Sequence, residues 1–208
     1  GSEFLKSFLL FMERVIAHGI VNSLSQLILK NTAPGIPDTF QGTETWNLSF
    51  VDPDNRRKVD FDGLSESLDQ MITRYNDNAS ELAKELWQNP VNGKIKQWIS
   101  WLTLKERIEN QDLFLKGDYI PLNVTGENKN HIIAYYRDYK DQHVIIILPV
   151  NTAGMQVDLS WENTFVELPE FPSKYFANIL TGQKSEISQR LGVNDLFDII
   201  PFAILSRF

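Results

Sequence analysis

The spacing of apolar residues changes once along this chain, near Gly117, and that change limits the folds open to it. Before this glycine the apolar residues recur every three or four positions, which is the period of an amphipathic helix. After it, short runs rich in β-branched and aromatic residues alternate with turn-prone pieces, which is typical of strands. We therefore predict an α+β fold, with helices over residues 1–116 and an antiparallel, sandwich-like β domain over residues 117–208.

The helical part begins with a strongly apolar segment. This segment is predicted to form one helix from Glu3 to Lys30, or two helices broken near Gly19, and the "APGIP" that follows must end it. Further helices are predicted over residues 62–75, 80–88 and 92–114. Asp62 and Ser80 are the expected N-caps. The residues expected to form the buried stripe of the last helix are Ile95, Trp98, Ile99, Leu102 and Ile108.

Six strand regions are predicted in the second part, over residues 118–126, 131–139, 143–150, 164–169, 175–182 and 202–208. The pieces between them, such as "GENKN", "KDQ" and "NTAG", are rich in turn-forming residues. Short connections of this kind indicate antiparallel pairing.

Composition argues against several classes of function. The formal net charge of −7 disfavours a nucleic-acid-binding protein and an anionic membrane surface as partners. No run reaches the roughly 18 apolar residues of a membrane span. The chain has no cysteine, which excludes thiol chemistry and fits a cytoplasmic protein. Phosphate-binding and nucleophile-elbow motifs are lacking, and the three histidines have no ligand partner at helical spacing, so we expect no metal site.

One irregular stretch, Asn31 to Phe61, combines prolines and glycines with charged and aromatic residues. Its candidate functional side chains are the carboxylates of Glu44, Asp52 and Asp54, the guanidinium groups of Arg56 and Arg57, and the rings of Trp46 and Phe50. Paired carboxylates act on glycosidic bonds, and flat aromatic faces suit sugar rings. A solvated loop with surface ion pairs explains the same residues. Local chemistry leaves both interpretations open.

Three motifs in and before this stretch resemble the maltooligosyl trehalose synthases, a family of the α-amylase superfamily (glycoside hydrolase family 13). They are "NSLSQ", "PGIPDTFQGTETW" and "DPDNRRKVD", in the order that the family shows. Phe40 stands where the family usually has tyrosine. Later pieces, "GKIKQWISWLTLKER", "LFLKGDYIPLNVTG" and "NILTG", are also similar, so the resemblance covers nearly the whole chain.

The resemblance implies that residues 1–116 are the end of a (β/α)8 barrel and residues 117–208 the C-terminal domain of a longer enzyme. In this comparison "PDTFQG" is the last barrel strand, the active-site loop lies within residues 38–61, and closing helices follow. The family's catalytic carboxylates lie on earlier strands, so no catalytic residue is expected in this chain. The substrate-binding residues that the resemblance implies are Gln41, Glu44, Trp46, Asp52, Asn55, Arg56 and Arg57.

The activity that the resemblance implies for the whole enzyme is an intramolecular transfer. It moves the reducing-end glucose of a malto-oligosaccharide from an α-1,4 to an α,α-1,1 linkage, an isomerase reaction of trehalose biosynthesis. The partner is the malto-oligosaccharide, and no cofactor or metal is needed. The chain alone, as a C-terminal portion, is expected to be inactive.

Two alternatives remain open at this point. One is a free-standing glucan-binding β module that uses Trp161, Tyr175 and Phe176 for sugar stacking. The other is a subunit that completes a separate catalytic chain. The helical part argues against the first alternative, because a self-contained β module has no use for it.

A barrel end without its barrel also has consequences for folding. Residues 38–42 are expected to form a loop, because a parallel strand needs hydrogen-bonding neighbours. The apolar helix within residues 3–30 is expected either to fold onto Ile95–Leu102 or to pair with a second copy, since exposing its face to water is costly.

Overall fold

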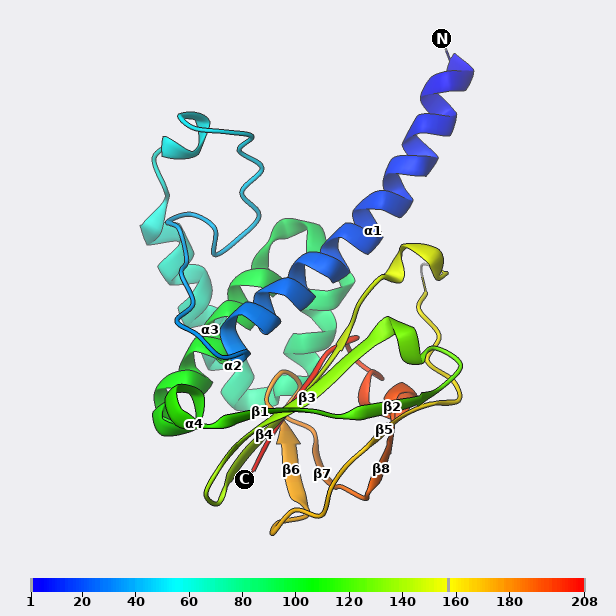
Figure 1. Ribbon diagram of the computed structural model, residues 1–208. Coiled ribbons are helices and arrows are strands. Elements are labelled where there is room, and N and C mark those ends of the chain that lie inside the picture. Colours follow the sequence, from blue (N-terminus) through cyan, green and yellow to red (C-terminus); the bar gives the residue numbers. More distant parts are fainter. Residues whose placement is uncertain (1, 157, 208) are drawn as a thin grey trace.

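The computed structural model describes residues 2–156 and 158–207 of the chain. The helices are α1 (Ser2–Thr32), α2 (Phe61–Gln88), α3 (Lys94–Glu109), α4 (Gln111–Lys116) and α5 (Val193–Leu196). Helices α1 to α4 cover one face of a six-stranded sheet, and a three-stranded sheet with the short helix α5 covers the other face (Figure 1). The predicted combination of helices and antiparallel sheet is confirmed.

Both sheets are antiparallel, with strand orders β1-β3-β4-β9-β6-β7 and β2-β5-β8. The strands of the larger sheet are β1 (Asp118–Pro121), β3 (Ile132–Tyr139), β4 (Gln142–Pro149), β6 (Tyr175–Asn178), β7 (Lys184–Glu186) and β9 (Ala203–Arg207). Those of the smaller sheet are β2 (Asn123–Gly126), β5 (Thr164–Glu167) and β8 (Arg190–Gly192). Each of the six predicted regions contains a strand, whereas β7 and β8 were not predicted.

The central position of β4 explains its sequence. Val144, Ile146 and Leu148 belong to the core cluster under the helices, whereas Ile145 and Ile147 belong to the cluster between the sheets. Successive side chains of a strand point to opposite faces, so a strand covered on both faces needs an almost continuous apolar run. The helices α1, α2 and α3 share the first cluster with β3, β4 and β9.

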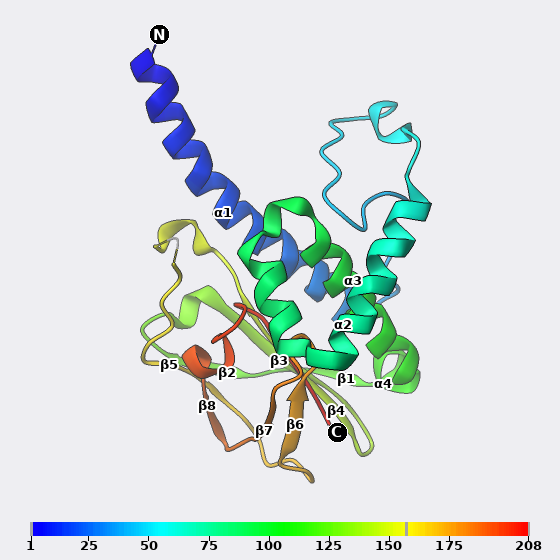
Figure 2. The same cartoon turned by 180° about the vertical axis from the view of Figure 1, so that it is seen from behind.

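α1 is one unbroken helix that passes through Gly19 and ends at Thr32. Its second half packs against α3, and its buried side chains include Leu24 and Ile28. Its first half projects away from the body (Figure 2). The exposed large apolar residues of that half are Phe4, Leu5, Phe8, Leu9, Leu10, Phe11, Val15 and Ile16. The expected packing on α3 therefore holds for the second half only. Among the described residues, no helix is long and apolar enough to span a bilayer.

The start of α2 differs from the sequence prediction. The N-cap is Asp60, whose carboxylate accepts a hydrogen bond from the backbone N–H of Gly63 at 3.1 Å. The prediction of Asp62 as the cap was wrong, because Asp62 lies inside the first turn.

α2 also joins the two helices that were predicted separately, with non-helical Asn78 between them (φ −155°, ψ 91°). Asn78 caps the second segment, since its Oδ1 accepts from the backbone N–H of Glu81 at 3.1 Å. The prediction of Ser80 as this cap was wrong, because the Ser80 hydroxyl donates to the carbonyl of Thr181 at 2.7 Å.

The segment predicted as one helix over residues 92–114 is divided at Asn110 into α3 and α4. Four of the five residues predicted to be buried are so: Ile95, Trp98, Ile99 and Leu102. The fifth, Ile108, is 78% exposed. It follows Leu102 by six residues, about 240° around a helix, so it lies off the buried stripe, which continues instead through Glu106.

Candidate functional site

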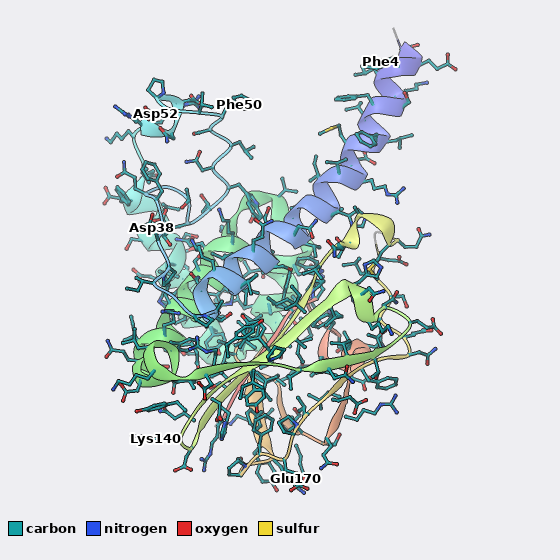
Figure 3. All side chains as sticks on the ribbon, viewed as in Figure 1. Phe4, Asp38, Phe50, Asp52, Lys140 and Glu170 are labelled. Atoms are coloured by element: carbon teal, nitrogen blue, oxygen red, sulfur yellow. The ribbon has the colours of Figure 1, made fainter. Side chains whose placement is uncertain are left out.

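The predicted site lies in the connection between α1 and α2, residues 33–60, which we call the α1–α2 loop. The loop extends from the body on the same side as the exposed half of α1 (Figure 3). Asp38 lies near its base, and Phe50 and Asp52 lie at its tip. Within this fully described loop, the regular secondary structure is a 3-10 turn over Asp54–Arg56. Residues 38–42 are loop rather than strand, as expected.

The charged residues at the tip pair with one another. Arg56 donates from Nε and Nη2 to the two carboxylate oxygens of Asp52, at 2.7 and 2.8 Å, and Arg57 pairs with Asp54. The Arg56 and Asp52 side chains are 71% and 55% exposed, so this pair stabilises the fold little. The four groups carry no net charge together, and such a tip suits a neutral ligand better than an ionic one.

Trp46 is fixed at the base of the loop. Its indole Nε1 donates to the carbonyl of Pro90 at 2.7 Å, and its partly buried ring packs against the helical core cluster. Gly93 permits this close approach, because a Cβ atom there would lie 3.0 Å from Cβ of Thr45 and 3.2 Å from the backbone nitrogen of Trp46. The φ angle of Gly93, +82°, also favours glycine.

A groove of about 530 Å³ lies between the loop and the start of α2. Three of the seven predicted substrate-binding residues line it, namely Trp46, Asn55 and Arg57. Its other polar lining residues include Asn47, Ser49, Lys58 and Asp60. The remaining four predicted residues, Gln41, Glu44, Asp52 and Arg56, are in the same loop but outside this lining.

Two buried polar atoms of the loop have no hydrogen-bond partner among the described residues: Oε2 of Glu44 and Oδ1 of Asn55. Buried polar atoms are normally paired. Asn55 lines the groove, but its unpaired amide oxygen has almost no exposed surface, so a ligand hydroxyl can reach this acceptor only if the side chain turns. An aromatic ring with several hydrogen-bonding groups in one groove fits a hydroxyl-rich ligand.

Sequence reasoning missed Lys96 of α3. Its Nζ donates to the carbonyl of Thr45 at 2.9 Å and lies 5.3 Å from the centre of the Trp46 ring. Burial lowers the pKa of Lys96, the nearby charge of Lys30 lowers it further, and the Glu44 carboxylate opposes both effects. Lys96 is fifty residues from Trp46 in the sequence, and no local pattern marks it.

The three histidines each contact a different residue, and two of these, Asn151 and Thr152, are consecutive. His18 contacts the hydroxyl of Thr152 at 3.2 Å, His131 contacts the carbonyl of Asn151 at 3.0 Å, and His143 contacts Asp138 at 2.8 Å in a geometry that satisfies neither ring nitrogen fully. Among the described residues, no group of three or more His, Cys, Asp or Glu side chains is arranged to hold a metal ion.

The structure argues against the alternative of a glucan-binding β module, because two of its three proposed sugar-stacking residues are buried. Trp161 is 2% exposed and Phe176 is fully buried, both within the cluster between the two sheets. Tyr175 is exposed. Trp161 and Phe176 therefore pack in the core, where they cannot stack on a sugar.

The fold and the loop together define an α+β protein in which one helical layer and an antiparallel two-sheet domain carry a long loop with aromatic and polar side chains. The sequence is similar to the putative maltooligosyl trehalose synthase of Mycobacterium tuberculosis, at 28% identity over 92% of this chain. The structure is similar to a variant of maltooligosyltrehalose synthase from Arthrobacter ramosus, with a TM-score of 0.76, 29% identity and 95% of this chain covered.

A second crystal structure of a maltooligosyl trehalose synthase matches 100% of this chain with a TM-score of 0.71 and 28% identity. The resemblance found from the motifs is thereby confirmed. The chain spans about a fifth of these proteins: 21% of the Mycobacterium relative, and 23% and 24% of the two solved structures. No protein-family model matches the chain.

Proposed function

We propose that this chain is the C-terminal portion of a maltooligosyl trehalose synthase, an isomerase of glycoside hydrolase family 13. The observation that carries the proposal is the extent of the likeness, which takes in the helices, the loop and the β domain together. A free-standing glucan-binding module is not favoured, because the likeness is not confined to the strands and two of its three candidate aromatic residues are buried.

Residues 1–116 correspond, in this proposal, to the end of a (β/α)8 barrel, and residues 117–208 to the C-terminal β domain. Residues 38–61 then contain most of the segment that matches the last barrel strand and the active-site loop after it, at the end of the barrel where the active sites of such folds lie. The exposed apolar half of α1 projects on the same side as this loop, which is expected if further barrel elements pack there. The two parts share one core cluster. They are therefore proposed to correspond to different parts of the longer enzyme, but they do not fold as independent units.

The proposed reaction consumes no net water, because one glycosidic bond of the malto-oligosaccharide breaks and an α,α-1,1 bond forms within the same molecule. The carboxylates that carry it come from the preceding barrel strands, through a retaining mechanism. This chain contributes the substrate-facing loop and excludes water, since water would divert the transfer to hydrolysis.

The loop side chains have different proposed roles. Trp46 supplies a flat face, and Asn55 and Arg57 offer hydrogen bonds to sugar hydroxyls in the groove. The other proposed substrate-binding residues, Gln41, Glu44, Asp52 and Arg56, lie in the rest of the loop, outside the groove lining. We also propose a cytoplasmic location, which the lack of cysteine supports.

A chimera tests the proposal. The matching segment of the Arthrobacter enzyme is replaced by this chain, and maltopentaose is supplied to the purified protein. We expect a trehalose-terminated product, detected by chromatography and by NMR of the anomeric protons. The Trp46→Ala chimera is expected to lose at least about tenfold in kcat/KM, because the ring face that is proposed to stack on a sugar is removed. The 208-residue chain alone is expected to give no product.

The control is an exposed apolar substitution away from the loop, Leu115→Ala of α4 in the same chimera, which is expected to keep full activity. A chimera that folds, as judged by a cooperative thermal transition, and yet yields no product from maltopentaose contradicts the proposal. Turnover by the isolated chain above a protein-free control contradicts it as well, because it would require catalytic groups within these residues.

A further inference from the structure

Three polar side chains of α3, Lys96, Thr103 and Arg107, form a stripe along one face of the helix. They follow one another by seven and four residues, which places them within about one quadrant of the helix surface. All three bond to the end of α1 or to the α1–α2 loop. Lys96 and Arg107 are eleven residues apart, about three turns or roughly 16 Å along the axis.

Arg107 holds the point where α1 ends and the loop begins. Its Nη1 donates to the carbonyl of Asn31 and its Nη2 to that of Gly35, both at 2.8 Å. Carbonyls in the last turn of a helix lack partners within the helix, so a cation that donates to them also meets the negative end of the helix dipole. Thr103 supports the same point by accepting a hydrogen bond from the side-chain amide of Asn31 at 2.8 Å.

Lys96 holds the far end of the same loop segment. Its ammonium group is partly buried, and it is satisfied by the Thr45 carbonyl and the Trp46 ring. Among the described residues it forms no ion pair with a carboxylate. A partly desolvated cation held in this way interacts with aromatic rings more strongly than an exposed one. The charge is therefore directed at the backbone and ring of the loop.

The tip of the loop has no comparable attachment. The hydrogen bonds described for residues 47–57 all join members of that segment to one another, such as Asn47 to Ser49 and Asp52 to Arg56. The place of the tip relative to the body is consequently set at the base, by the attachments on either side of it.

We propose that Lys96 and Arg107 are positioning residues, which use α3 as a fixed frame to hold the first half of the α1–α2 loop and thereby set the orientation of Trp46 in the groove. Neither Lys96 nor Arg107 lines the groove, so each acts on it through the loop residues that it holds. Their role as aids to glucan binding rests on the proposed function, whereas their effect on the loop does not.

The test uses the 208-residue chain labelled with 5-fluorotryptophan, in which the Trp46 resonance is assigned by a Trp46→Phe variant. The variants are Lys96→Met, Lys96→Arg and, as a matched control, Lys94→Met, which removes an exposed lysine from the same helix. Arg107→Met is compared with Arg107→Lys in the same way. Amide hydrogen exchange is followed over residues 33–50 and over the buried part of α3.

We expect Lys96→Met to shift and broaden the Trp46 fluorine resonance and to speed amide exchange at residues 43–47 by about tenfold or more, as the loss of a charge-assisted hydrogen bond implies. Exchange in the buried part of α3 should stay at the wild-type rate. Lys96→Arg should restore most of both signals, because the cation and donor return. Arg107→Met should act in the same manner on residues 33–38. Lys94→Met should change neither.

A wild-type Trp46 resonance and wild-type loop exchange in Lys96→Met overturn the proposal, as does equal acceleration throughout α3, which marks a merely structural role. Titration with maltopentaose separates this inference from the proposed function. A Trp46 resonance that responds to the sugar, and does so at least about fivefold more weakly in Lys96→Met, supports both. A loosened loop in a chain that ignores the sugar supports the positioning role and counts against glucan binding by this chain.

Discussion

Arg137 is a buried cation that, among the described residues, forms no ion pair with a carboxylate. Its guanidinium group instead donates to five backbone carbonyls, those of Thr32, Leu113, Phe114, Gly117 and Asp118. These carbonyls belong to the ends of α1 and α4 and to the start of β1. One side chain therefore links the C-terminal ends of two helices to the sheet, at a position where the helix dipoles favour a cation.

Arg137→Met is expected to lower the free energy of unfolding by about 3 kcal/mol or more, because it leaves several buried carbonyls without donors. The stability of Arg137→Lys should lie between those of the wild type and Arg137→Met, since lysine keeps the charge but lacks the planar fork of donors. Urea denaturation measures both. Arg74→Met, which breaks an exposed pair with Glu85, serves as the control and should change little. A loss in Arg137→Met no larger than in this control contradicts the assignment.

Glu106 is a second buried ionisable residue, and its effect depends on pH. It accepts hydrogen bonds from Ser206 at 2.7 Å and from Asn110 at 2.8 Å. Burial raises the pKa of the Glu106 carboxyl, the hydrogen bond from Ser206 opposes this, and Glu109 adds to it. A raised folded-state pKa means that the folded chain binds the proton more tightly than the unfolded chain. Stability is then lost as the pH rises from the unfolded pKa through the folded one.

Glu106→Gln should therefore be more stable than the wild type at pH 8, and this advantage should shrink as the pH is lowered towards 4. Glutamine keeps an oxygen that can accept both hydrogen bonds, so the difference isolates the charge. Urea unfolding at several pH values is the measurement, with the exposed Glu66→Gln as control. An advantage that does not vary with pH would show that the Glu106 carboxyl titrates alike in both states.

At the scale of elements, α2 shows how a polar residue divides a helix. Asn78 leaves the helical conformation, and its side chain caps the following segment, while Ser80 is occupied by its bond to Thr181. Asn78→Ala should lower stability by about 1 kcal/mol, as loss of an N-cap does. Asp62→Ala, at the position where the cap was predicted, should have a much smaller effect. Thermal unfolding compares them, and equal losses would contradict the assignment of the cap.

The period change at Gly117 was sufficient to predict that a helical part precedes a β part, because apolar spacing is a local property, but the short helix α5 among the strands was not predicted. The strands β7 and β8 were missed because "KSE" and "RLG" have neither alternation nor length, and they pair only once their partners β6 and β5 are in place. The candidate site shows the same limit. Trp46, Asn55 and Arg57 could be named from the loop, whereas Lys96 reaches Trp46 only through the packing of α3.

At the scale of the whole molecule, the helices and the larger sheet form one unit, since a single core cluster contains residues of α1, α2, α3, β3, β4 and β9. What stays outside this unit is the first half of α1 and the tip of the loop, which both project on one side (Figure 1). Large apolar side chains are exposed on both, including Phe4 at 72% and Phe50 at 93%. Monomeric soluble proteins rarely leave such a surface uncovered.

We therefore expect the isolated chain to associate through the first half of α1. Burying one Leu or Phe side chain contributes roughly 1.5–3 kcal/mol, so pairing even a few of the eight exposed residues outweighs the cost of association. Solution scattering and sedimentation should show a mass that rises with concentration. Removal of residues 2–16 should abolish the rise without lowering the unfolding temperature, because the core contacts of α1 begin beyond them. The control Val91→Glu, at an exposed apolar site elsewhere, should associate as the wild type does. A monomer at every concentration would show that this helix is tolerated in water, and association that persists after the deletion would assign it to another surface.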